Sequence, residues 1–187
     1  MRKKTTKTDI GLLALRLTTG GLLAGHGAQK LFGWFGGHGV AGTAGWLESL
    51  GLRPGKPWAL AAGASELGGG LLTALGLLSP LGPLSAIGAM AMATAKGHWG
   101  KPIWVTAGGA ELPLTNVAIA TALAAAGPGR YSLDRALGLK LPTWLMLPGA
   151  AAALALGAFG VQTNPAPRQA KQQREEATQA TTQGDKA

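Results

Sequence analysis

Ionisable and amide side chains lying within or beside long apolar runs are the residues of this chain best suited to chemistry. They are Arg16, His26, Gln29, Lys30, Glu66, His98 and Glu111. A charged group inside an apolar run costs about 3 kcal/mol on membrane-insertion scales, so such residues face inward and find partners. A carboxylate beside an imidazole can also carry a proton. The set therefore predicts a polar pocket that holds a small redox-active or polar molecule.

Five apolar runs position these residues, and each approaches the length of about 20 residues that a helix needs to cross a membrane. The runs are 10–32, 58–79, 81–96, 111–126 and 143–162. Between positions 57 and 95 the only formal charge is Glu66, whereas a helix pair in water would carry a solvated stripe. We expect an all-α integral membrane four-helix bundle with a fifth transmembrane helix, which Pro148 kinks or delays.

Composition excludes several other classes of protein. Of 187 residues, 47% are apolar and 13% are charged, and no Cys is present, so the chain itself can form no disulfide or thiolate site. The net charge of +9 comes without a basic stripe interleaved with aromatic residues, which argues against nucleic-acid binding. All six tryptophans lie at or beside the ends of apolar runs, as in the aromatic belt of a membrane protein.

Charge also predicts orientation and domain organisation. The basic terminus 1–9 and the basic loop residues Arg130, Arg135 and Lys140 are expected on the cytoplasmic side of the cell membrane. The multi-pass bundle would occupy 10–135, and a linker with the fifth run would occupy 136–162. The polar tail 163–187 is expected to be disordered.

Depth along the helices suggests which polar groups meet. His26 and Glu66 lie at nearly the same expected depth, which predicts a hydrogen bond between them. Arg16 lies nearer the inner side, and its long stem could reach toward Glu66. Lys30, His98 and Glu111 would converge with the pair on the outer half. Glycines on the facing surfaces of the first two helices would let them pack closely; they are Gly20, Gly27, Gly63 and Gly70.

Two outer loops carry patterns of their own. Apolar residues at helical spacing between 40 and 50 predict a short interfacial helix. Residues 99–109 suit either a strand-like lid or an ordered connecting loop.

Four sequence motifs resemble those of the DoxX family in the same order. They lie at 25–33 (GHGAQKLFG), 66–69 (ELGG), 108–114 (GGAELPL) and 127–134 (GPGRYSLD). The resemblance covers about residues 10–135. It implies a small membrane protein of four core helices, linked to membrane oxidoreductase assemblies and to thiol or sulfur redox balance. Relatives named DoxD belong to a thiosulfate:quinone oxidoreductase. The fifth run, the polar tail and the absence of Cys depart from the family, so a partner would perform any thiol chemistry.

The resemblance also points to individual residues. His26, Lys30, Glu66, Glu111 and Arg130 fall on the family's motifs and are worth testing. The last motif has first a structural role, as a helix-ending turn with Ser132 as a possible cap; its members are Gly127, Gly129, Arg130, Tyr131 and Asp134.

Several functions remain open at this point. The first is a redox-linked membrane subunit that binds a quinone, with His26 and Glu66 handling protons. The second is a non-catalytic scaffold whose basic inner surface docks a soluble oxidoreductase, with the polar residues only locking helices together. A transporter is disfavoured because no inverted repeat is visible. Haem or metal is disfavoured because the three histidines are scattered. Whether the chain catalyses a reaction, and whether it forms a homo-oligomer, stays open.

Overall fold

The computed structural model describes residues 7–163 and consists of helices and loops without any strand in that range. The main helices are α1 (Lys7–Phe32), α2 (Gly39–Ser49), α3 (Gly55–Leu75), α4 (Leu81–Ala93), α5 (Glu111–Ala126), α6 (Leu133–Leu137) and α7 (Met146–Gln162). Short helical turns are η1 (Trp34–Gly36), η2 (Thr94–His98), η3 (Val105–Ala107) and η4 (Thr143–Leu145). The all-α expectation is confirmed, whereas the predicted disordered tail lies outside the described residues from position 164.

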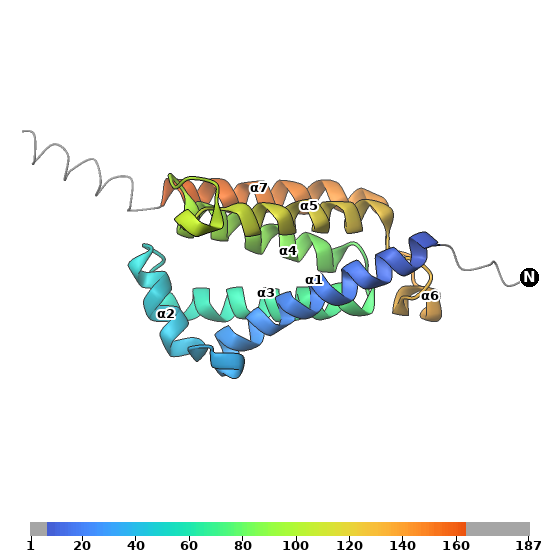
Figure 1. Cartoon of the computed structure of the whole chain (residues 1–187), viewed down its shortest axis with the longest axis horizontal. Helices are drawn as coiled ribbons and strands as arrows, with labels where there is room; N and C mark the ends of the chain where they lie inside the picture. Colours follow the sequence, from blue (N-terminus) through green and yellow to red (C-terminus); the bar gives the residue numbers. More distant parts are fainter. Residues whose placement is uncertain (1–6, 164–187) are drawn as a thin grey trace, which may run out of the picture.

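The helices form two layers (Figure 1). α1 and α3 lie across one another in one layer, and α4 packs against both α5 and α7 in the other, with α2 at one end and α6 near the opposite end. The most extensive packing joins α1 to α3. α4 is central, because it packs against α3, α5 and α7.

Glycine makes the α1–α3 contact possible. A Cβ added to Gly20 would lie 2.6 Å from the Gly70 carbonyl oxygen, and one added to Gly27 would lie 2.7 Å from the Gly63 carbonyl oxygen. These atoms are backbone and cannot move aside cheaply, so the two helices touch through their main chains. The predicted packing faces of the first two helices are therefore present, as expected for small-residue contacts.

The remaining elements correct several details. The predicted short helix in the first loop is α2. The strand-like lid was wrong, because residues 99–110 form an irregular loop around the 3₁₀ turn η3. The fifth helix begins late, with Pro148 in its first turn, where proline needs no hydrogen-bonded N–H.

Within residues 7–163, no helix combines the length and the sustained apolarity of a membrane crossing. α4, α5 and α7 contain 13, 16 and 17 residues, short of the roughly 20 that were expected. The predicted set of five membrane-spanning helices is thus not confirmed.

Candidate functional site

The candidate site is a cavity of about 460 Å³ between the two layers, bordered by α2, α3, α4 and α7. Most of its wall is apolar and comes from small or aliphatic side chains, including Ala62, Gly88 and Leu156. Trp46 and Trp58 also line it. Ligand sites in proteins are usually concave, apolar and of this size, with a few polar groups that fix orientation.

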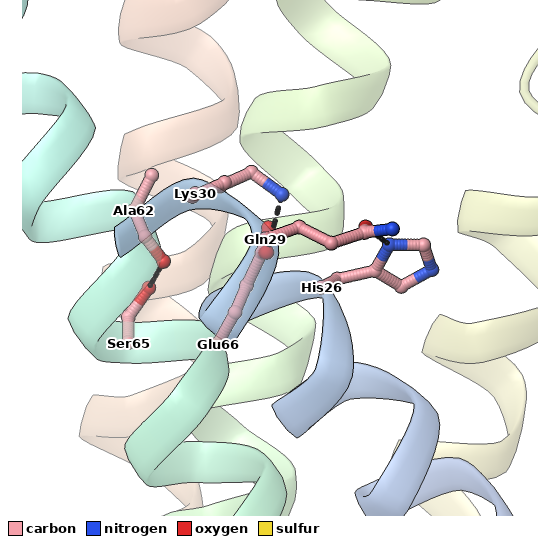
Figure 2. Close-up of polar contacts among 6 residues, drawn as sticks. All are labelled: His26, Gln29, Lys30, Ala62, Ser65 and Glu66. Carbon is pink, nitrogen blue, oxygen red and sulfur yellow. Dashed lines mark hydrogen bonds and ion pairs between the residues drawn. The ribbon is translucent and has the colours of Figure 1, made fainter. Parts of the chain in front are cut away.

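An ion pair between α1 and α3 lies in the wall of the cavity. Lys30 Nζ donates to Glu66 Oε2 at 2.5 Å. Glu66 is 6% exposed, and a carboxylate so deeply buried needs a charged or hydrogen-bonding partner. Figure 2 shows Lys30 reaching from the end of α1 to Glu66 on α3. The close approach at Gly27, one turn earlier on α1, brings the two side chains within reach.

Lys96 adds a second ammonium group to the same wall. It lies on the π-turn η2, is 4% exposed, and donates from Nζ to the carbonyl oxygen of Leu50 at 3.1 Å. Lys96 was not among the predicted pocket residues. The sequence feature that could have indicated Lys96 is its position as the basic last residue of the otherwise uncharged run 81–96. Its place on a π-turn is a second indication, because such turns often lie at functional sites.

Two serines contribute hydroxyl groups to the cavity. Ser85 Oγ donates to the carbonyl oxygen of Ser65 at 2.9 Å. Ser65 Oγ donates to the carbonyl oxygen of Ala62 at 3.0 Å (Figure 2). Each hydroxyl donates its hydrogen to a backbone carbonyl oxygen and retains lone pairs that can accept a hydrogen bond from a ligand. The cavity thus offers ammonium donors, one carboxylate and hydroxyl acceptors in an apolar surround.

His26 does not reach this cavity. Its Nδ1 lies 2.9 Å from Gln29 Oε1, and Gln29 Nε2 donates to the carbonyl oxygen of Phe35 at 3.2 Å. The imidazole is exposed and points away from α3 (Figure 2). The predicted His26–Glu66 hydrogen bond was therefore wrong. The expected depths of His26 and Glu66 did not take account of the direction of the side chain. His26 precedes the α3-facing Gly27 by one residue, which places it about 100° around the helix from that face. The longer side chain of Lys30 reaches Glu66 instead.

Arg16 lies at the other end of the bundle and does not approach Glu66, contrary to expectation. Its Nη1 and Nη2 donate to the carbonyl oxygens of Pro128 and Tyr131, and the residue is 3% exposed. The guanidinium occupies the space that a Cβ of Gly76 would fill. Gly76 follows α3 and has a φ of 61°. Glycine is therefore suited to this position for two reasons: it adopts the left-handed backbone readily, and it leaves space for the Arg16 guanidinium.

His98 and Glu111 organise the 99–110 loop instead of the cavity. His98 Nδ1 donates to the carbonyl oxygen of Gly108 at 2.7 Å. Glu111 Oε2 accepts from the Val105 N–H at 2.8 Å, and the Glu111 N–H donates to the carbonyl oxygen of Ile103 at 2.9 Å. Of the seven predicted pocket residues, the structure therefore brings only Lys30 and Glu66 to the cavity.

The motif at 127–134 folds back over the ends of α1 and α3. The Asp134 carboxylate accepts from the N–H groups of Leu78 and Ser79, both at 2.8 Å. Ser132 caps α6 by accepting from the Arg135 N–H, and Asp9 Oδ1 accepts from the Arg130 N–H at 3.1 Å. These contacts tie α1, the α3–α4 turn and α6 together at one end.

Comparisons with known proteins bear on the same region. The DoxX family model matches residues 11–99, which run from α1 to just beyond the π-turn. No curated protein and no solved structure matches the chain. The matched range includes Lys30, Glu66 and Lys96, while the motifs at 108–114 and 127–134 lie outside it. Similarity to the DoxX family suggests a small membrane protein linked to redox systems. Residues 11–99 of this chain are similar to the DoxX family.

Proposed function

We propose that this protein is a membrane-embedded component of a redox system and binds a quinone-like molecule in the cavity beside Lys30, Glu66 and Lys96. The observation that carries the proposal is the combination of an apolar cavity of about 460 Å³ with a buried lysine–glutamate pair in its wall. A quinone has an apolar ring and tail and two carbonyl acceptors, which correspond to the apolar wall and the ammonium donors.

The exterior of the bundle supports the membrane part of the proposal. Large apolar side chains are exposed on every long helix, among them Leu22 on α1, Leu71 on α3, Leu114 on α5 and Leu154 on α7. So many exposed large apolar side chains are unusual for a monomer in water. α4 continues directly into the π-turn η2, so the uninterrupted helical segment extends from 81 to 98.

Charge at the ends of the bundle supports the multi-pass orientation. Arg130, Arg135 and Lys140 lie at the same end as the start of α1, as the Asp9–Arg130 hydrogen bond requires. Basic residues gathered at one end favour that end as cytoplasmic. We propose that the amino terminus lies in the cytoplasm and the Lys30–Glu66 pair lies toward the outer side.

The proposed chemistry needs an electron donor. Reduction of a quinone to a quinol consumes two electrons and two protons. The electrons would come from an oxidoreductase partner, and Glu66 would pass protons while Lys30 donates a hydrogen bond to a quinone carbonyl. The imidazole of His26 has no direct role, because it lies outside the cavity.

The experiment is identification of the lipophilic molecules that co-purify with the full chain in mild detergent, for wild type and Lys30→Met. Loss of a charged hydrogen-bond donor should weaken retention of a quinone roughly 10- to 100-fold. Lys56→Met is the matched control, since Lys56 is exposed and does not line the cavity. The proposal would be contradicted if no quinone co-purified with wild type, or if Lys30→Met retained as much quinone as Lys56→Met.

A Glu66→Gln variant separates this proposal from the scaffold alternative. The substitution keeps the side-chain shape and removes the negative charge. Normal assembly with an oxidoreductase but impaired quinone reduction supports the binding role, while normal assembly with normal activity favours a scaffold.

A further inference from the structure

A second cavity lies at the end of the bundle opposite α2. It has a volume of about 500 Å³, and its charged lining residues are Asp9, Arg130, Asp134, Arg135 and Lys140. It shares no lining residue with the quinone cavity, and an inference about it stands apart from the proposed function.

The two carboxylates of this cavity are engaged by the protein. Both oxygens of Asp134 accept backbone N–H groups, from Leu78 and Ser79. Asp9 Oδ1 accepts from the Arg130 N–H. Hydrogen bonds from these N–H groups fix the carboxylates in the wall, so neither is left as a lone negative group aimed at a ligand.

The cations are less fully engaged. Among residues 7–163, Arg130 Nη1 is buried and has no hydrogen-bond acceptor. A buried donor without an acceptor costs about 1–3 kcal/mol, and Arg130 also lines the cavity. Arg135 and Lys140 are exposed at the rim. Three cations against two engaged carboxylates give the cavity a net charge of +1.

Apolar side chains beside these cations indicate which kind of anionic ligand the cavity suits. Leu139 and Leu141 also line the cavity, and Leu137 next to them is 63% exposed. Arginine pairs with phosphate through two parallel N–H···O bonds, while neighbouring leucines suit an attached glycerol or acyl group. We propose that this cavity binds a phosphate anion, either the headgroup of an anionic phospholipid or a free phosphate.

The test titrates the full chain in detergent with short-chain phosphatidylglycerol, short-chain phosphatidylcholine and inorganic phosphate. We expect saturable binding of phosphatidylglycerol that is weakened about fivefold for each cation removed, hence roughly 25-fold in Arg135→Gln/Lys140→Gln. The control Arg53→Gln/Lys56→Gln removes the same charge from exposed positions at the opposite end and should bind as wild type does.

The arms of the titration distinguish the source of the phosphate. Saturable binding of inorganic phosphate as tight as that of phosphatidylglycerol assigns the site to a free anion, whereas saturable binding of phosphatidylglycerol alone assigns the site to a lipid headgroup. Arg130→Lys keeps the charge but loses the two-pronged geometry, so it should also weaken binding. Absence of saturable binding, equal binding of phosphatidylcholine, or equal loss in both double variants would overturn the proposal. None of these results affects the quinone measurement.

Discussion

Gly27→Ala is expected to destabilise the bundle by about 1–3 kcal/mol, the usual cost of overpacking a tight contact. The new Cβ would lie 2.7 Å from both the Gly63 carbonyl oxygen and Leu67 Cα. These atoms belong to the backbone of α3, so α1 and α3 must move apart. The displacement would also separate Lys30 from Glu66, and ligand retention should fall along with the melting temperature measured by circular dichroism in detergent.

Gly25→Ala is the matched control for this experiment. It lies on the same helix, and a Cβ there meets nothing within 4 Å. Since alanine is the better helix former by up to about 1 kcal/mol, this variant should be as stable as wild type or slightly more stable. Equal melting temperatures for the two variants would show that α1 and α3 do not touch through their main chains.

Arg16→Met should produce the largest loss of stability, about 3–5 kcal/mol, which is typical of breaking a buried charge interaction from one side. Methionine preserves most of the volume but leaves the carbonyl oxygens of Pro128 and Tyr131 without their donor. It also removes the positive charge that attracts Asp134. For a chain of this size the melting temperature should fall by roughly 10 °C.

Arg53→Met provides the comparison, since Arg53 is exposed and its loss should change stability by less than about 0.5 kcal/mol. Arg16→Lys should restore little of the lost stability, because a single ammonium group cannot replace the two guanidinium N–H donors that reach the two carbonyl oxygens. Full rescue by lysine would mean that the charge alone matters at this position and that the two hydrogen bonds contribute nothing.

The sequence was informative wherever the pattern was local. The apolar runs located the helices, the spacing of Gly20, Gly27, Gly63 and Gly70 located the contact between α1 and α3, and Ser132 was correctly interpreted as a cap. Each of these features depends on residues a few positions apart or on one helix face. Their geometry follows from helix periodicity alone.

The candidate site was predicted only in part because it depends on contacts between distant segments. Arg16 binds a loop 112 to 115 residues away, and no local pattern indicates that the loop folds back onto α1. No local pattern indicated that Trp58 stacks on Phe159 of α7, with ring centroids 5.8 Å apart. Lys96 was not predicted as a pocket residue, because its place in the cavity depends on α2 and α7 closing around it.

Occlusion of the cavity is the sharpest test of whether the quinone binds there. Decylubiquinone is titrated into the full chain in detergent, with binding followed by equilibrium dialysis, for wild type, Ala89→Phe and Ala150→Phe. Ala89 lines the cavity, whereas Ala150 is exposed on α7 and does not. We expect saturable binding by wild type and Ala150→Phe and at least roughly tenfold weaker binding by Ala89→Phe, because the added ring takes the ligand's space. Unsaturable binding by wild type, or undiminished binding by Ala89→Phe, would contradict quinone binding in this cavity.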